Sequence, residues 1–180
     1  MKQLLSLAFL ALLLVGCSSP RVTTDFAQGT TFSRFRTFEY RDSADSLAVS
    51  SPLLHQRIVD ALRGAMISSG LSEVKENPDL FVTYYGSTDQ ETHFQTTYTG
   101  VNTWNGSRRN TGGVGFGTAT STTRPTTVTR GTLVIDVWDA SNNSLIWRGV
   151  ATSALSSNPQ RNTQTVKRAI EMAFRNFPPN

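Results

Sequence analysis

The sequence is poor in the side chains from which many catalytic and metal sites are built. Of its 180 residues, one is a cysteine, two are histidines, and only 17% carry a charge. A single cysteine excludes a disulfide bond within the chain, so the fold must be held by its hydrophobic core even in an oxidising compartment. One cysteine and two histidines also leave no Cys/His cluster for zinc, and no cofactor is expected.

Long hydrophobic runs are also lacking, except at the start of the chain. Residues 4–15 are apolar apart from Ser6, and Lys2 precedes them. This run is too short to cross a hydrocarbon core of about 30 Å as a helix, and it has the length of a signal-peptide hydrophobic region. It predicts an export signal over residues 1–16.

The signal ends in Leu14-Val15-Gly16-Cys17, which resembles the lipobox of bacterial lipoproteins. The resemblance implies a diacylglycerol on the Cys17 sulfur, cleavage before Cys17, and acylation of the new amine, for example with palmitate. Because Ser18 and not Asp follows Cys17, the resemblance favours the periplasmic face of the outer membrane over the inner membrane. The alternative is an ordinary secretory peptide in which the cysteine occurs by chance.

The charge of the chain argues against one class of partner. The formal net charge is +4, and removal of Lys2 with the signal lowers it by one. Because no long run of lysine and arginine is present, nucleic acid is not an expected partner. A mildly basic surface suits anionic lipid or a cell-wall polymer.

Periodicity predicts a single α+β domain over residues 21–180, behind a short tether at residues 17–20. Alternating apolar residues predict strands over residues 21–26, 37–40, 80–98, 132–138 and 145–151. With two predicted helices, these strands indicate a two-layer sandwich. In it, the helices pack on one face of a mostly antiparallel sheet of about five strands.

The two helices are predicted from apolar residues at four-residue spacing. The first is capped by Ser51 and ends at Gly70, and a glycine inside it, Gly64, suggests a close neighbour there. The last helix is expected to be capped by Asn162 or Thr163. Residues 42–50, before the first helix, are expected to form a polar loop.

The clearest structural pattern is a hairpin formed by residues 132–138 and 145–151. Pairing Asp136 with Arg148 separates an apolar face from a half-polar face, whereas a slip by one residue would set Arg148 opposite Ile135. The apolar face would contain Leu133, Ile135, Val137, Leu145, Trp147, Gly149 and Ala151. We therefore expect this register, with an Asp136–Arg148 pair on the other face.

Residues 100–130 are rich in Thr, Gly, Ser and Asn and read as an insertion in the domain. One interpretation is a flexible surface excursion without a role in binding. The other is a binding loop, because its arginines suit phosphate or carboxylate and its aromatics suit an apolar surface. The candidate binding residues are Trp104, Arg108, Arg109, Phe116 and Arg124.

Motifs of catalysis are missing as well. Residues 105–109 lack the last glycine of a Gly-x-Ser-x-Gly elbow, and residues 112–117 lack the Gly-Lys-Ser/Thr ending of a phosphate loop. An oxygen-ligand metal site is conceivable but lacks EF-hand spacing, so solvated loop charges account for its residues. Those residues are Asp42, Asp45, Asp89 and Glu91. We expect no catalytic and no metal-binding residues.

One combination of short segments runs along the chain from Asp25 to Pro179. The segments are Asp25-Phe26, Thr37-Phe38-Glu39-Tyr40, Pro78-Asp79-Leu80, Gly131-Thr132-Leu133-Val134-Ile135-Asp136, Leu145-Ile146-Trp147-Arg148-Gly149-Val150-Ala151 and Phe177-Pro178-Pro179. Together they resemble the bacterial lipoprotein family known as domain of unknown function 4136, over about residues 21–179. The resemblance implies an envelope lipoprotein and brings no established activity.

The sequence therefore predicts a membrane-anchored envelope lipoprotein that acts as a non-catalytic binding or structural module. Its expected partners are the bilayer, through acylated Cys17, and another envelope protein or a cell-wall polymer. One alternative is an envelope hydrolase or other enzyme, which a pocket joining Asp136 or His93 to a second titratable group would favour. Another is a membrane-surface contact module that acts through the loop Trp104–Arg124.

Overall fold

The computed structural model describes residues 19–43, 47–100 and 119–178. They form two compact units. We call the described residues up to Asp89 and from Thr129 onward the core unit, and those between Gln90 and Val128 the ribbon. Within the described ranges, no helix has both the length and the apolar character needed to cross a membrane.

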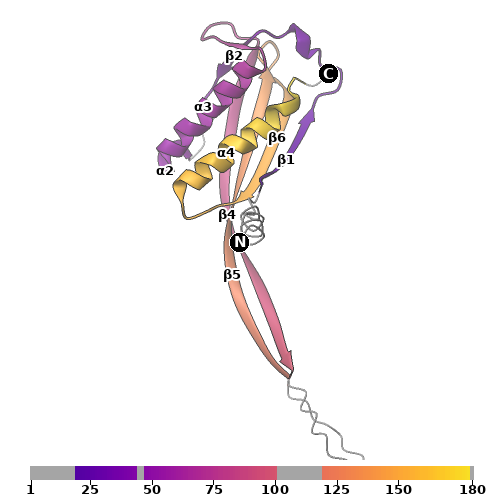
Figure 1. Cartoon of the computed structure of the whole chain (residues 1–180). Coiled ribbons are helices and arrows are strands. Elements are labelled where there is room, and N and C mark those ends of the chain that lie inside the picture. Colours follow the sequence, from indigo (N-terminus) through magenta and orange to yellow (C-terminus); the bar gives the residue numbers. More distant parts are fainter. Residues whose placement is uncertain (1–18, 44–46, 101–118, 179–180) are drawn as a thin grey trace, which may run out of the picture. The chain divides into compact units, whose positions relative to one another are not determined.

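Six strands of the described chain form one sheet in the order β1-β6-β5-β4-β2-β3 (Figure 1). Strand β6 pairs antiparallel with β1 and β5, and β2 pairs parallel with β3 and β4. Strands β4 and β5 run antiparallel, since Thr92 lies opposite Thr127 and Thr96 opposite Thr123. The bounds are β1 (Arg21–Phe26), β2 (Thr37–Tyr40), β3 (Ser72–Glu73), β4 (Leu80–Gly100), β5 (Ala119–Asp139) and β6 (Ser144–Ala154).

The α+β class is confirmed, but the sheet is mixed and has six strands where about five, mostly antiparallel, were expected. The parallel pairing follows from the order of the elements. After β2 the chain passes through a long helix and β3 and returns as β4 beside β2. A crossover through a helix connects parallel strands, whereas a tight hairpin connects antiparallel ones.

The strand predictions for residues 21–26 and 37–40 are confirmed as β1 and β2. Between them, residues 32–34 form the short 3-10 helix η1 (Phe32–Arg34). One interpretation of residues 100–130 was a flexible surface excursion. This interpretation is wrong from Ala119 onward, because strand β5 begins there. The threonines that suggested a loop are β-branched, and such residues favour strands when a partner strand is present.

Helix α3 (Pro52–Ser68) lies where its apolar spacing predicts it, with Ser51 at the N-cap. At its end Gly70 adopts a φ of 88°, and the amides of Gly70 and Leu71 donate to the carbonyls of Ile67 and Met66. This is the Schellman arrangement, which satisfies carbonyls at a helix end and needs a left-handed residue.

Two expectations around α3 are wrong. The expected polar loop over residues 42–50 contains the short helix α2 (Leu47–Ser50), and Leu47 packs against the core. The close neighbour expected at Gly64 is not found, since a Cβ there would meet no atom of the described chain within 4 Å.

Helix α4 (Pro159–Ala173) begins earlier than predicted, and the short 3-10 helix η2 (Phe174–Asn176) follows it. Its N-cap is Asn158, whose side chain accepts hydrogen bonds from two amides of the first turn. The expected caps Asn162 and Thr163 lie inside the helix instead. The Asn162 side chain bonds both the amide and the carbonyl of Ser156 at 2.8 Å, which fixes the loop before the helix.

The predicted hairpin register is confirmed for most of its length, with Asp136 opposite Arg148. A β-bulge between Val137 and Trp138 shifts the register by one residue at the turn end. As a result Ile146, expected on the half-polar face, is 4% exposed and belongs to the core.

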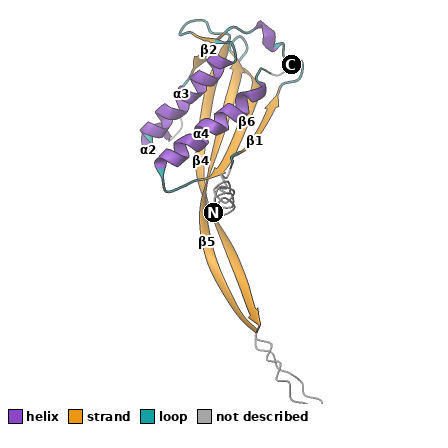
Figure 2. Cartoon of the chain, in the orientation of Figure 1, coloured by secondary structure: helices purple, strands orange, loops and turns teal. Residues whose placement is uncertain are grey.

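The two long helices lie over the same face of the sheet (Figure 2). Helix α3 contacts α4, β2 and β3, and α4 contacts β1 and β6. Between helices and sheet lies an aromatic cluster in which the Trp147 ring is 5.0 Å from that of Phe174 and 5.3 Å from that of Phe177. This cluster fastens the C-terminal end of α4 to β6.

Gly149 makes room for this cluster. A Cβ at position 149 would lie 2.6 Å from the end of the Trp147 ring and 3.4 Å from the side chain of Ala173. Contacts below 3 Å are repulsive, so a larger residue at position 149 would push Trp147 or α4 away from the sheet.

Replacing Trp147 with alanine should unfold the protein at a markedly lower temperature. Trp147 is 3% exposed, and removal of such a ring from a core costs about 3–5 kcal/mol. The change is measured by thermal or urea denaturation. Ile67→Ala is the control, because Ile67 is 55% exposed and should change little. A Trp147→Ala protein that melts with the wild type would contradict this account of the core.

Candidate functional site

A polar cleft of about 630 Å³ opens in the core unit where β4 begins and β5 ends. Its walls come from η1, β2, the loop before β4 and the β5–β6 turn. Three cations and three carboxylates line it, namely Arg34, Arg41, Lys75, Glu39, Asp79 and Asp139. The cleft is therefore polar but balanced in charge.

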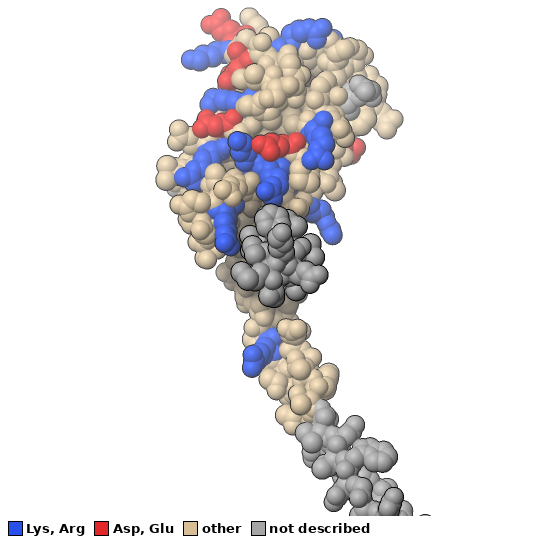
Figure 3. All heavy atoms as spheres, viewed as in Figure 1, with Lys and Arg blue, Asp and Glu red and all other residues tan. Residues whose placement is uncertain are grey.

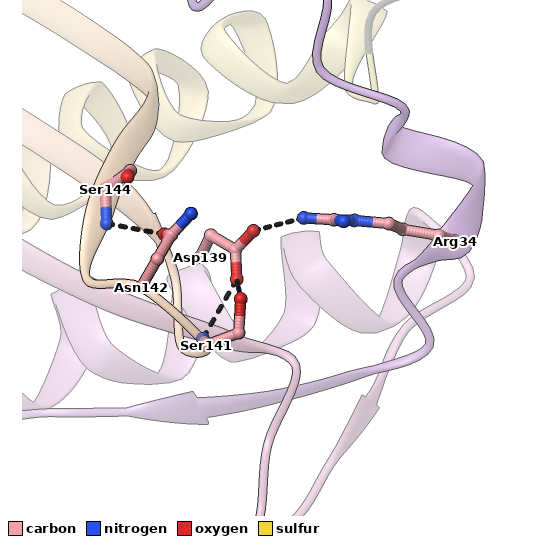
Figure 4. Close-up of polar contacts among 5 residues, drawn as sticks. All are labelled: Arg34, Asp139, Ser141, Asn142 and Ser144. Carbon is pink, nitrogen blue, oxygen red and sulfur yellow. Dashed lines mark hydrogen bonds and ion pairs between the residues drawn. The ribbon is translucent and has the colours of Figure 1, made fainter.

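Asp139 is 3% exposed and holds two distant segments together (Figure 4). One carboxylate oxygen accepts hydrogen bonds from the Ser141 amide at 2.9 Å and the Ser141 hydroxyl at 2.6 Å. The other oxygen pairs with the guanidinium of Arg34 on η1. Burial alone would raise the pKa of Asp139, but Ser141 and the Arg34 charge outweigh it and hold the pKa below the usual carboxyl range.

Asp79 makes a matching junction between β2 and β4. Its carboxylate accepts hydrogen bonds from the amides of Arg36 at 2.8 Å and Thr37 at 3.0 Å. Its own amide donates to the Thr37 hydroxyl at 3.0 Å. The Arg36 amide, then that of Thr37, lowers the pKa of Asp79 despite the opposing effect of burial. A carboxylate held in this way is a structural acceptor.

Arg41 and Glu39 in the cleft form an ion pair with each other. Arg41 is 3.1 Å from a Glu39 oxygen, and its guanidinium carbon lies 3.1 Å from the centre of the Phe81 ring. In the described part of the chain, no three metal-ligating side chains come together. The cleft therefore offers polar contacts along its walls, with its carboxylates already engaged by the protein.

A second titratable cluster lies between α3 and the sheet. His55 Nδ1 is 2.6 Å from the Tyr84 hydroxyl, and His55 Nε2 is 3.5 Å from an Asp42 carboxylate oxygen. Burial first, and then the Asp42 charge, raises the pKa of Tyr40, whose ring stacks on that of Tyr84. Tyr84 is 2% exposed, so a substrate does not reach its hydroxyl in this conformation. The cluster is a hydrogen-bonded polar part of the core.

The ribbon consists of residues 90–100 of β4 and residues 119–128 of β5. Its strands are joined on one face by threonine pairs, Thr92 with Thr127 at 3.4 Å and Thr96 with Thr123 at 2.9 Å between hydroxyl oxygens. Residues 90–99 and 120–127 are all exposed. The ribbon thus has strand pairing but almost no core of its own.

Two large aromatic side chains stand on the threonine face of the ribbon. Side chains alternate along a strand, so Phe94 and Tyr98 share a face with Thr92 and Thr96. Phe94 is 72% exposed and Tyr98 is 74% exposed, more than any other large hydrophobic residue whose exposure is described. Such side chains are typical of a surface that a partner covers.

Few of the predicted site residues can be placed. Cys17 lies outside the described residues, as do four of the predicted binding-loop residues, Trp104, Arg108, Arg109 and Phe116. Arg124 is described and is an exposed residue of strand β5, so the loop prediction is wrong for this residue.

The surroundings of Asp136 and His93 are described separately in the two units. Arg148 and Asp136 form the expected cross-strand pair, with both contacts at 2.7 Å. His93 lies in the ribbon, 3.5 Å from a Glu91 oxygen. The juxtaposition that would favour an enzyme, Asp136 or His93 with a second titratable group in one pocket, is not found among the pockets described.

The exposure of Phe94 and Tyr98 was not predicted, although a signal for their strand exists in the sequence. Every second residue from Thr92 to Tyr98 is a threonine or an aromatic residue, and such a period of two is typical of strands. Asp139 carries no comparable signal, because its partner Arg34 is 105 positions away in the sequence.

The family is established by comparison with known proteins. Residues 22–179 match the model of the domain of unknown function DUF4136, and the chain therefore belongs to this family. This confirms the resemblance seen in the sequence. A comparison with curated proteins finds no match.

Solved structures with a TM-score above 0.5 to this chain share its fold at low sequence identity. A DUF4136 family protein from Bacteroides thetaiotaomicron VPI-5482 is 11% identical, with a TM-score of 0.53 over 90% of this chain and 97% of that chain. A PDZ domain protein from Parabacteroides distasonis ATCC 8503 is 15% identical, with a TM-score of 0.57. That match covers 98% of this chain, which spans 40% of the length of that protein. A minor lipoprotein from Acinetobacter baumannii is 8% identical, with a TM-score of 0.35 over 79% of this chain and 92% of that one.

Asp139→Asn should make the protein less stable at neutral pH and less sensitive to acid. A carboxyl whose folded pKa is lowered stabilises the fold above its unfolded pKa of about 3.9, and this stabilisation is lost as the pH falls through the folded pKa. We expect a loss of about 1–3 kcal/mol near pH 7, for the broken Arg34 and Ser141 contacts, and a smaller difference in strong acid. Thermal denaturation across this pH range measures both effects.

Asp60→Asn is the matched control, because Asp60 is exposed on α3. An Asp139→Asn protein whose melting temperature follows that of the control at every pH would show that the Asp139 network does not hold the cleft together.

Proposed function

We propose that this chain is a lipid-anchored envelope protein and a non-catalytic binding module that contacts a partner protein through the ribbon. The observation that carries the proposal is the ribbon itself. It presents Phe94 and Tyr98, each more than 70% exposed, on a pair of strands with no core beneath them.

The energetics of the ribbon support a partner. A two-stranded hairpin is marginally stable in water by itself, because it buries too little apolar surface to offset its ordering entropy. In the ribbon the pairing is supplemented by threonine hydroxyl contacts and not by burial. A protein that covers Phe94 and Tyr98 would supply the missing apolar contacts.

The chemistry of the ribbon favours a protein over a polyanion. In residues 90–100 and 119–128, and leaving tyrosine aside, the residues with charged or titratable side chains are Glu91, His93 and Arg124. One acidic and one basic residue cancel, so the described strands of the ribbon carry no net charge that would attract a charged polymer. Exposed aromatics with threonine around them suit a surface of mixed polarity, as at protein interfaces.

The strand edges of the ribbon differ in how open they are to such a partner. The pairing of β4 with β2 is found at Leu80–Val82, and that of β5 with β6 begins at Arg130, so each ribbon strand has one edge without a strand described beside it. Pro125 lies in β5, and proline is tolerated where its missing N–H would face outward. The outer edge of β4 is therefore the better template for an added strand.

Anchoring through Cys17 is the second part of the proposal. It is supported by the lipobox-like Leu14-Val15-Gly16-Cys17 and by the single cysteine of the chain. It places the protein on the periplasmic face of the outer membrane, because Ser18 follows the cysteine.

Cys17→Ala should abolish the anchor. Because the thiol accepts the diacylglycerol, the variant should keep its signal segment and take up no clickable palmitate analogue, whereas wild type and the control Ser18→Ala should be labelled. Fractionation of cells followed by gel analysis measures both properties. Equal labelling of Cys17→Ala and wild type would contradict a lipid anchor at this residue.

Replacing both ribbon aromatics should release the partner. Phe94→Ser with Tyr98→Ser should lower the yield of crosslinked partner in cells by roughly tenfold or more, as expected for residues that act as interface anchors. In-cell crosslinking followed by mass spectrometry is the measurement.

The matched control is Leu53→Ser with Ile67→Ser, which removes two hydrophobic side chains that are 66% and 55% exposed on α3. Both double variants should melt near the wild-type temperature. A partner that is captured equally by the ribbon variant and by the control would overturn the assignment of the ribbon.

A further inference from the structure

The helices carry an excess of positive charge on their exposed surface. Together α3, α4 and η2 hold six cationic side chains and two acidic ones. The cations are Arg57, Arg63, Arg161, Lys167, Arg168 and Arg175, and the acidic residues are Asp60 and Glu171. Figure 3 shows lysine and arginine side chains gathered over α3 and α4. We call this surface the basic helix face.

Most of these cations are not neutralised by the protein. Arg63 pairs with Glu73 at 2.8 Å, and Arg57 donates to a threonine hydroxyl. The other four are exposed, and no salt bridge to them occurs within residues 19–43, 47–100 and 119–178. Their charge is therefore available to an external anion.

On the opposite face of the sheet, two arginines are paired with carboxylates. Arg148 is held by Asp136 and lies opposite Asp25 in the strand ladder. Arg41 is held by Glu39.

The start of the described chain lies against the same helices. Pro20 is buried and lines an apolar pocket with Leu54 and Ile58 of α3 and Val166 of α4. Cys17 precedes Pro20 by three positions, a reach of at most about 10 Å. That reach is comparable to the Debye length of about 8 Å at physiological ionic strength, so charges on a membrane holding Cys17 would be felt by these helices.

We propose that the basic helix face binds the headgroups of anionic phospholipid in the membrane that holds Cys17. The inference rests on the lipid anchor proposed above. Cations spread over two neighbouring helices suit a plane of phosphates, to which each is attracted within a Debye length. Arginine adds several hydrogen-bond donors that match phosphate oxygens.

The experiment uses the acylated full-length protein, reconstituted into vesicles of phosphatidylcholine alone or mixed with phosphatidylglycerol. Because the chain has one cysteine and acylation would block it, a single introduced cysteine can carry a fluorescent label. Gln164→Cys places the label on exposed α4, and Thr23→Cys places it on exposed β1, beside the tether but on the other face of the sheet.

A headgroup-linked quencher then reports which face meets the lipid. With phosphatidylglycerol, quenching at position 164 should rise several-fold more than at position 23. The rise should disappear at about 1 M salt, where the Debye length is about 3 Å. Lys167→Glu should reduce it, and Arg161→Glu combined with Lys167→Glu and Arg168→Glu should abolish it. Lys75→Glu is the matched control, because Lys75 is an exposed lysine that belongs to neither helix, and it should leave the rise unchanged.

The outcomes separate this inference from the anchor on which it rests. A protein that carries no acyl group and enters neither vesicle overturns both. Suppose that the protein is acylated, but that phosphatidylglycerol does not change the quenching at position 164 or changes it equally at positions 164 and 23. Either result overturns the basic helix face alone. If soluble polyglutamate protected the label at position 164 as much as vesicles with phosphatidylglycerol do, the assignment to lipid would be overturned. The face would then be a general polyanion site.

Discussion

The packing of the Trp147 ring over Gly149 fixes the position of the helices on the sheet. The ring fills the space that a side chain at position 149 would need, and it meets Phe174 and Phe177 where α4 ends. With this contact in place, α4 lies along β1 and β6 and contacts α3, which in turn contacts β2 and β3. The orientation of the basic helix face, and of the pocket that holds Pro20, depends on that placement.

Much of this fold could be predicted from local patterns. The sequence pattern predicted both ends of the strands at residues 21–26 and 37–40 correctly. The segregation of apolar side chains predicted correctly that Asp136 lies opposite Arg148. The failures have physical causes that no local pattern contains. The bulge after Val137 lies next to the β5–β6 turn at Asp139, whose partner Arg34 is remote in sequence. The parallel position of β2 depends on where α3 returns the chain.

The candidate site was harder to predict than the fold, because its composition imitates a loop. Residues 119–128 are threonine-rich with little apolar content and give no amphipathic signal, yet Thr123 meets Thr96 of the predicted strand at 2.9 Å. Strand formation there depends on the partner strand, which only the folded hairpin supplies. The buried hydrophobic residues lie in the core unit, whereas Phe94 and Tyr98 of the ribbon are exposed.

The apolar pocket around Pro20 has a consequence for how tension would pass through the molecule. Gly86, Thr88 and Gly131, which precede and follow the ribbon in the chain, line this pocket together with Pro20. In the sheet, Arg21 and Thr132 both lie opposite Thr152 of β6, so a single strand separates them. A load applied along β5 would therefore reach Arg21, at the start of β1, through the single strand β6, without passing along α3 or α4.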